Sequence, residues 1–278
     1  MDPVQKAIWF VEGHLGEPFS LEDVADVAGL SRFHLVRAFG QVTGRSVMRY
    51  VRARRLSEAA RVLAGGAPDI ISVAFDAGYG SHEAFTRAFR DQFGKTPEQV
   101  RGQGCAKSLE LVEPLRLDEL TAIKLADPVY IDHGPLLLAG LLEHYRDGDM
   151  SAIPNQWQRF APWIGNIPHQ VPDVSYGVVF NGDDEGTTDY LTAMEVTDFS
   201  DVPAPLARLR LGAQRYAVWR HPGHITEIRA VWRTIWSEWA PVRVKTLADA
   251  PFFERYPEVF DPVTGAGGFE IWLPTSLP

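Results

Sequence analysis

The chain has 278 residues and a formal net charge of −9, with 45% hydrophobic and 23% charged residues, a composition typical of a soluble globular protein long enough for two domains. Its one cysteine, Cys105, excludes an intramolecular disulfide and a thiol cluster for zinc. The longest strongly apolar run, residues 136–142, is far shorter than the roughly 20 residues that cross a bilayer, and no signal peptide is evident at the N-terminus. We therefore expect a cytoplasmic protein without a membrane partner.

The charge is divided unevenly along the chain. Residues 1–107 carry 14 Lys and Arg against 12 Asp and Glu, whereas residues 108–278 carry 13 against 24. A mildly basic segment can neutralise phosphates locally, while a strongly acidic one repels nucleic acid and attracts cations. The two halves are therefore expected to face different partners.

The first half contains a duplicated unit, residues 24–44 and residues 73–94. When Ser31 is aligned with Ser81, the coinciding pairs are Arg37/Arg87, Ala38/Ala88, Phe39/Phe89 and Gly44/Gly94, with Gly80 as one extra residue in the second copy. Each copy predicts a short helix, a turn containing glycine and a second helix that begins at serine, a residue type that caps free N–H groups. This is the helix-turn-helix pattern, whose second helix can enter the major groove.

The second helix of each copy has a predicted buried face and a predicted outward face. Leu35, Ala38 and Phe39 in the first copy, and Phe85, Ala88 and Phe89 in the second, form the buried faces. The outward candidates for DNA contact are Arg32, Phe33, Val36, Arg37, His82, Glu83, Thr86 and Arg87. Arginine binds guanine bidentately, so Arg37 and Arg87 are the candidates for base contact; phosphate contact or a solvated surface position is the alternative for each.

A continuous amphipathic pattern between the copies predicts a helix of roughly 18 residues, about 27 Å long, which could hold two reading helices near successive major grooves. Its expected core positions are Val47, Tyr50, Val51, Leu56, Ala59 and Leu63. Arg49, Arg52, Arg54 and Arg55 crowd its first turns. Beside two helix-turn-helix units we expect phosphate contact by some of them, with Arg49 and Arg52 as candidates; a solvated face is the alternative.

These residues carry a family resemblance. FSLEDVADVAGLSRFHLVRAFGQVTG at residues 19–44 and VAFDAGYGSHEAFTRAFRDQFGKTPEQVR at residues 73–101 resemble the double helix-turn-helix domain of AraC/XylS transcription regulators, and the resemblance covers about residues 3–104. It implies double-stranded operator DNA and RNA polymerase as partners. Val36 departs from several relatives that carry glutamine there, which leaves the target sequence open.

The second half predicts an α+β domain of two related halves. Residues 108–125 are expected to be a linker or a first strand, and the order strand, helix, strand, strand then occurs twice. The predicted architecture is multi-domain: an all-α domain with two helix-turn-helix units at residues 1–107 and an α+β domain at residues 108–278.

The last strand, GGFEIWLP at residues 267–274, draws attention to Glu270. A period of two places Phe269, Ile271 and Leu273 on one face, and Glu270 and Trp272 on the other. A carboxylate beside tryptophan indicates either an edge strand that meets water or a pocket.

The segments YGVVF, DYLTAMEV, YAVWRHPGHITEI, PFFERY and EIWLP, in this order, resemble the GyrI-like effector-binding domain, and the whole chain resembles Rob-type AraC regulators. By motif position the resemblance makes Glu270 the cleft carboxylate that receives lipophilic cations, which is consistent with cation–π attraction by neighbouring aromatic rings. The pocket candidates are Glu270, Trp272, Trp157, Trp163, Tyr176, Tyr190, Trp219 and, as a second carboxylate, Glu195; Trp232, Trp236 and Trp239 are expected to be core.

No cofactor, metal site or catalytic residue is expected. His221 and His224 flank a Pro-Gly turn without a third ligand, and Asp183, Asp184 and Glu185 lack a calcium-loop pattern. The sequence predicts a transcription regulator with a small cationic or aromatic effector. Two alternatives stay open: a GyrI-like hydrolase of electrophilic small molecules with Glu270 as acid or base, and an architectural activator that acts without a ligand.

Overall fold

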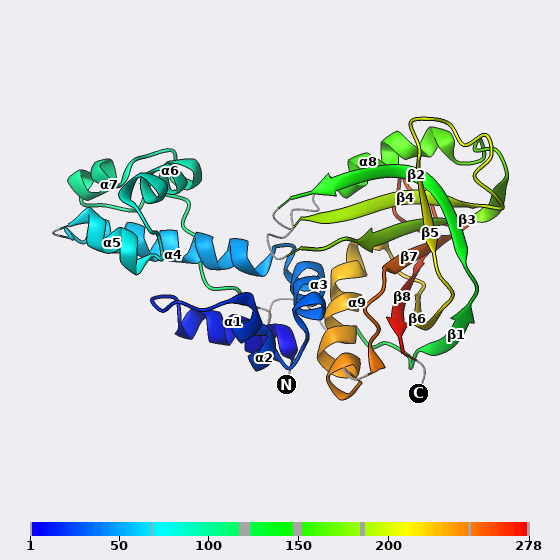
Figure 1. The fold of residues 1–278 in the computed structure, drawn as a ribbon, viewed down its shortest axis with the longest axis horizontal. Helices are drawn as coiled ribbons and strands as arrows, with labels where there is room; N and C mark the ends of the chain where they lie inside the picture. The colour runs from blue at the N-terminus through cyan, green and yellow to red at the C-terminus, as the bar shows by residue number, and fades with distance from the viewer. Residues whose placement is uncertain are drawn as a thin grey trace.

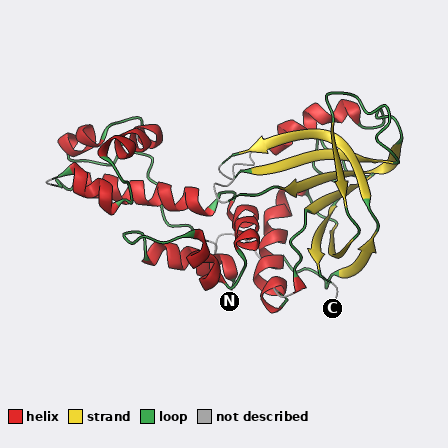
Figure 2. Cartoon of the chain, viewed as in Figure 1, coloured by secondary structure: helices red, strands yellow, loops and turns green. Residues whose placement is uncertain are grey.

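The structure, a computed structural model, describes residues 2–67, 69–116, 123–146, 152–183, 187–243 and 246–276. Helices come first in the chain, and a curled antiparallel sheet with helices against one face follows (Figures 1 and 2). The predicted fold class is confirmed: an all-α N-terminal part and an α+β C-terminal part.

The N-terminal part contains both predicted helix-turn-helix units. Its helices are α1 (Pro3–Gly13), α2 (Leu21–Ala28), α3 (Arg32–Thr43), α4 (Val47–Ala64), α5 (Ile70–Asp76), α6 (His82–Phe93) and α7 (Pro97–Gln103). The two second helices, α3 and α6, are capped by Ser31 and Ser81, whose side chains accept the backbone N–H of residues 34 and 84. Both helices end at a glycine in the left-handed conformation, Gly44 and Gly94. The duplication seen in the sequence is therefore a structural duplication.

Helix α4 joins the two units, and every core position predicted for it is buried. The first unit, through Leu35 and Phe39 of α3, belongs to a hydrophobic core that continues into the C-terminal part. The second unit, with Phe85 and Phe89 of α6, has a separate core against the end of α4. Figure 1 shows the second unit at the end of α4 that lies away from the sheet.

The C-terminal part is built on one sheet. Its strands are β1 (Val129–His133), β2 (Leu136–Tyr145), β3 (Gln170–Phe180), β4 (Thr188–Val196), β5 (Ala207–Leu211), β6 (Gln214–His221), β7 (Phe252–Pro257) and β8 (Phe269–Thr275). Their order in space is β1-β6-β8-β7-β3-β4-β2-β5, and all neighbours are antiparallel.

The predicted strand-helix-strand-strand repeat is confirmed. Helix α8 (Ile153–Phe160) follows β2 and precedes β3 and β4; helix α9 (Ile228–Thr234), continued by η4 (Ile235–Trp239), follows β6 and precedes β7 and β8. The two halves meet where β3 pairs with β7. The outer strands β1 and β5 extend the repeats and were not expected. No strand occurs at 108–116 or 123–125, and the rest of the expected linker lies outside the described residues.

The sheet has two buried faces. The helix face, with Phe269, Ile271 and Leu273, is covered by α8, α9 and η4. The inner face, inside the curl, buries its own aromatic cluster, which includes Phe253 and Trp272. The predicted alternation along the last strand is confirmed. Because β8 lies between β6 and β7, the edge-strand interpretation is wrong.

The tryptophans of α9 and η4 lie in the core, as predicted. Trp232 and Trp236 are fully buried and Trp239 is 7% exposed. Helix α9 also packs against α3 of the N-terminal part. The C-terminal part therefore contacts the first helix-turn-helix unit directly.

Candidate nucleic-acid interface and ligand pocket

The second reading helix, α6, presents its outward face to solvent. Glu83 and Arg87 are exposed, as predicted. His82 is partly buried and lies 3.2 Å from Glu98, and the hydroxyl of Thr86 is buried without a hydrogen-bond partner in the described part of the chain. Arg87 is thus accessible for base contact, whereas His82 and Thr86 are partly buried.

The arginines of α4 divide into two groups. Arg49 and Arg52 have exposed side chains, as phosphate contacts require. Arg54 is buried: it pairs with Glu12 at 2.8 Å and with Glu58 at 2.9 Å. Arg55 donates hydrogen bonds to two backbone carbonyls, those of residues 15 and 17. Arg54 and Arg55 are therefore structural, and the solvated-face alternative does not describe these two.

The first reading helix, α3, is largely covered. Arg32 is exposed and lies 3.5 Å from Glu22. Phe33 and Val36 are half-buried, and Arg37 is only 7% exposed. The prediction that Phe33, Val36 and Arg37 face outward is wrong for this structure, because the C-terminal part packs on that side of α3.

Arg37 is held by the C-terminal part. Its Nη1 donates a 2.6 Å hydrogen bond to the carbonyl of Ala250, and its guanidinium lies 3.5 Å from the ring centroid of Phe33 and 4.9 Å from that of Phe252. Burial lowers the pKa of Arg37 to about 9, although the nearby carboxylate of Asp249 opposes this shift. A side chain expected to read bases is thus an anchor between the two parts of the chain.

A pocket of about 290 Å³ lies where α3, α8, α9 and the helix face of the sheet meet. Four side chains linked by hydrogen bonds form one wall. Tyr190 and Tyr256 both donate to Oε2 of Glu254, at 3.0 and 2.8 Å, and the Trp157 indole donates to the Tyr190 hydroxyl at 3.2 Å. The pocket therefore has a carboxylate surrounded by aromatic rings.

Burial is the largest influence on the pKa of Glu254. Glu254 is 6% exposed, and desolvation raises the pKa of its carboxyl, while the tyrosine hydrogen bonds oppose the rise. Burial also raises the pKa of both tyrosines well above the ordinary value. Among the ion pairs of the described residues, none includes Glu254. Within the described part of the chain, the buried Glu254 carboxylate is therefore not neutralised by an ion pair.

The remaining walls come from both parts of the chain. Ile153 and Pro154 belong to α8, Ile228 and Arg229 to α9, and Gly40, Gln41 and Gly44 to the last turns of α3. The exposed Arg229 guanidinium crosses over Gly44 at the outer side, where a Cβ atom at Gly44 would stand 2.8 Å from it. The first helix-turn-helix unit thus forms part of the wall of this pocket.

Glu270 lies elsewhere. It projects from the inner face, pairs with Arg220 at 2.8 Å and with Arg255 at 3.0 Å, and accepts the Trp272 indole N–H at 2.9 Å. The interpretation of Glu270 as the carboxylate of an apolar cleft is wrong, because two arginines already neutralise it.

The other predicted effector residues are divided by the sheet. Trp157 and Tyr190 line the pocket with Glu254. Tyr176 donates to Glu195 at 3.1 Å, and both lie with Trp272 and Glu270 on the inner face. Trp219 is buried on the helix face against Trp239, and Trp163 is half-buried outside the pocket. The predicted set therefore does not form one site.

Sequence reasoning missed Glu254, although a signal was present. In PFFERYP, alternation places Phe252, Glu254 and Tyr256 on the same face of β7, and the structure shows that this is the helix face. A glutamate between two aromatic residues on a core face needs hydrogen-bond donors or a positive charge beside it, since burying a charge without compensation is costly.

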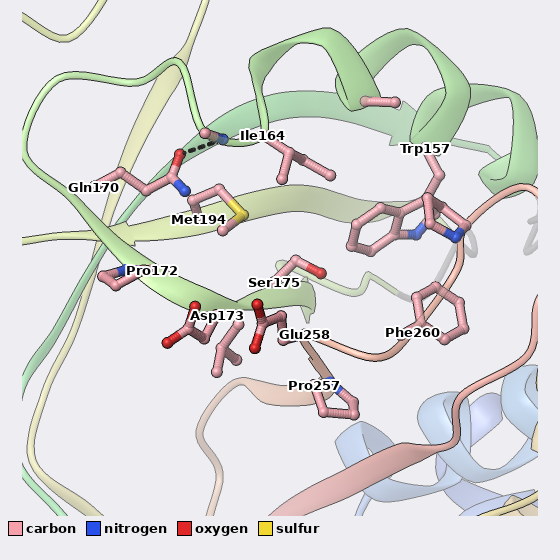
Figure 3. Close-up of a pocket in the computed structure, with 14 residues that line it drawn as sticks. Trp157, Ile164, Gln170, Pro172, Asp173, Ser175, Met194, Pro257, Glu258 and Phe260 are labelled. Atoms are coloured by element: carbon pink, nitrogen blue, oxygen red, sulfur yellow. Dashed lines mark hydrogen bonds between the residues drawn. The ribbon is translucent and has the colours of Figure 1, made fainter.

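A second cavity of about 500 Å³ adjoins the first, and Trp157, Phe260 and Pro262 line both. Figure 3 shows the carboxylates of Asp173 and Glu258 close together at its rim, opposite Met194. The side chains of Trp157 and Phe260 thus lie between the two cavities.

No group of three potential metal ligands occurs among the described residues. His221 instead pairs with Glu227, and the imidazole of His224 contacts Thr226 and the carbonyl of Thr264. Asp184 and Glu185 lie outside the described residues. Within the described part of the chain, no helix is long and apolar enough to cross a membrane.

Comparisons with known proteins cover both parts. Residues 24–103 match a helix-turn-helix domain family, and residues 135–275 match the GyrI-like small molecule binding domain family. The chain is 31% identical to the transcriptional regulator Rob of Salmonella typhimurium and 30% identical to the right origin-binding protein of Escherichia coli, in each case over 93% of this chain and 91% of the relative. A solved structure of SAV2435 bound to tetraphenylphosphonium aligns with a TM-score of 0.44 and 21% identity over 54% of this chain and 94% of that one.

The matches to both domain families and the near full-length similarity to two regulators agree in order and extent. The chain belongs to the AraC-type DNA-binding transcription regulators of Rob-type architecture, in which two helix-turn-helix units precede a GyrI-like domain.

Proposed function

We propose that residues 1–107 bind a duplex operator, that residues 108–278 bind a small lipophilic cation, and that the complex acts on transcription together with RNA polymerase. The exposed Arg87, Arg49 and Arg52 support the first part, since they can reach bases and phosphates. Glu254 supports the second part and is the observation that carries it.

Glu254 favours a cation for physical reasons. A carboxylate in an apolar pocket loses hydration, and an arriving positive charge restores a favourable environment for the ionised form. The rings of Trp157, Tyr190 and Tyr256 add cation–π attraction of roughly 0.5 to 2 kcal/mol each when they face the charge. A flat or bulky aromatic cation without strong hydration therefore suits the pocket better than a neutral or anionic molecule.

The test is ligand binding followed by tryptophan fluorescence, with tetraphenylphosphonium as the cation and triphenylphosphine oxide as a neutral aromatic molecule. Trp157 lies in the pocket and reports on occupancy. Glu254→Gln keeps the size and the hydrogen-bond acceptor but removes the charge. We expect it to weaken cation binding by at least about tenfold, or 1.4 kcal/mol.

Glu270→Gln is the matched control, because it removes a carboxylate from the same sheet on the inner face. We expect its cation affinity to equal that of the wild type. A loss of binding by Glu270→Gln with normal binding by Glu254→Gln would reverse the assignment. Equal, weak binding of the cation and the neutral molecule by all three proteins would contradict the cation-binding proposal.

The hydrolase alternative predicts that the bound small molecule is hydrolysed rather than held unchanged. Glu254 would then act as acid or base toward a reactive electrophile. Incubation with an epoxide, followed by chromatography, separates the two functions: a receptor leaves the epoxide unchanged above the buffer rate.

A further inference from the structure

The DNA-reading face of α3 is the surface on which the C-terminal part docks. Phe33, Val36 and Arg37 are spaced so that they share one face of the helix, the face that would meet bases in a major groove. Arg37 is buried, and Phe33 and Val36 are half-buried. The corresponding residues of α6, by contrast, include the exposed Glu83 and Arg87.

The docking surface on the C-terminal part is assembled from three segments. The residue 248–252 segment supplies the Ala250 carbonyl and the Phe252 ring to Arg37. The loop after β3 lies beside Val36, since a Cβ atom added at Gly182 would stand 3.9 Å from Cγ1 of Val36. Helix α9 and η4 contribute the rest, with the ring of Trp236 centred 6.4 Å from that of His34.

This contact and DNA binding exclude each other. The major groove is about 12 Å wide, enough for a bare helix but not for a helix whose reading face carries a second domain. We propose that the C-terminal part masks the first reading helix and competes with DNA for it, so that the docked chain can contact DNA only through its second helix-turn-helix unit.

The interface has features of a reversible contact. A cavity of about 570 Å³ remains beside Phe33 and Arg37, lined also by the exposed Asp249. The contact is also partly polar at this edge, through the Arg37 hydrogen bond to Ala250, and relative motion is common between domains whose interface is not wholly hydrophobic. Asp249 also attracts Arg37 electrostatically, so its charge favours the docked arrangement.

The ligand pocket provides a means of control, and this step rests on the proposed function. Gly40 and Gln41 of α3 and its C-cap Gly44 line one side of the Glu254 pocket, whose volume of about 290 Å³ is at the small end of the range for drug-sized ligands. A cation too large for the closed pocket binds only if α3 moves away. By linkage, such a cation favours the undocked chain and increases its affinity for DNA.

The test of masking needs no ligand. Asp249→Arg places a like charge beside Arg37 without altering the DNA-binding part. Glu258→Arg is the matched control: the same charge reversal at an exposed residue that lines the second cavity and not the cavity beside Arg37. With the full chain and a random-sequence duplex, we expect Asp249→Arg to bind DNA at least about tenfold more tightly than Glu258→Arg, within the usual range of coupling between sites. Equal affinities of the two variants would overturn the proposal.

A second measurement covers the case in which Asp249→Arg does not fold. The native thiol is first removed by Cys105→Ser. In this background, the rate of thiol labelling at Val36→Cys reports on the exposure of α3. Glu83→Cys on α6 gives the labelling rate for an exposed reading helix. We expect Val36→Cys to react at least about tenfold more slowly. Equal rates would show an uncovered α3 and refute masking. Tetraphenylphosphonium should raise the Val36→Cys rate; if it binds without doing so, only the ligand step fails.

Discussion

Tyr190 lies directly over Gly177, and a Cβ atom added at Gly177 would collide with the phenol hydroxyl and stand 2.8 Å from Cζ. Gly177 is paired with Glu254 across β3 and β7. The absence of a side chain at this position therefore allows Tyr190 to reach the buried carboxylate.

Gly177→Ala is expected to displace Tyr190 and weaken the Glu254 hydrogen bonds. Overpacking of this kind costs about 1 to 3 kcal/mol of unfolding free energy, and cation affinity should fall with it. Urea unfolding and fluorescence titration measure the two effects. Gly134→Ala is the control, since no atom lies within 4 Å of its added Cβ; equal losses in both variants would refute the steric explanation.

Stability should depend on pH through Glu254. Because its folded-state pKa is raised, the folded chain holds this proton more tightly than the unfolded chain. Unfolding free energy is therefore expected to fall as pH rises from the ordinary glutamate pKa through the raised pKa of Glu254. Denaturant unfolding at a series of pH values tests this, and Glu254→Gln should lack the slope contributed by this group.

Glu270 is expected to stabilise the fold rather than bind ligand. Glu270→Ala leaves Arg255 and the Trp272 indole without their acceptor, and unsatisfied buried donors cost about 1 to 3 kcal/mol each. The exposed Arg220 adds little, because water screens its pair. Chemical denaturation should show a loss of about 1 to 3 kcal/mol, because the partly exposed Arg255 can turn to water and the buried Trp272 indole dominates the cost. Unchanged stability would mean that the inner-face network is unimportant.

The arginines of α4 should separate into two phenotypes. Arg52→Ala should weaken DNA binding and reduce the salt slope by about one, as removal of a phosphate contact does. Arg54→Ala should instead destabilise the chain by about 3 kcal/mol or more, because it leaves Glu12 partly buried without its charge partner. Salt-dependent DNA titrations and thermal unfolding distinguish them; a normal salt slope for Arg52→Ala would exclude its phosphate contact.

Arg87 is expected to contribute base contact from α6. Arg87→Ala should cost about 1 to 3 kcal/mol of specific binding to an operator selected from a duplex library. Loss of affinity without loss of sequence preference would indicate a phosphate contact instead. Arg90→Ala, at another exposed position of α6, is the control.

Much of the fold follows from local sequence patterns. Ser31 and Ser81 mark the starts of the reading helices, and the alternation of Phe269, Ile271 and Leu273 defines the helix face of β8. These features were predictable because capping and alternation depend on residues close in sequence.

The site was less predictable because it depends on residues brought together from distant segments. The local sequence around Glu270 is that of a pocket residue. Its partners Arg220 and Arg255 lie 50 and 15 positions away in the chain, beyond the reach of a local pattern. Arg37 had the spacing of a base contact, but its acceptor lies 213 positions away, on Ala250. Periodicity assigns a residue to a face; it does not identify what covers that face.

Because α4 is long, a small tilt at one end of this helix becomes a larger displacement at the other end. Its 18 residues span about 27 Å, with the first helix-turn-helix unit at one end and the second near the other. A tilt of about 10° at the α3 end would swing α6 by about 5 Å, somewhat more than the 3.4 Å rise of one base pair. A small rearrangement at the contact between α3 and the C-terminal part is thus large enough, when it reaches α6, to exceed the spacing of neighbouring base pairs.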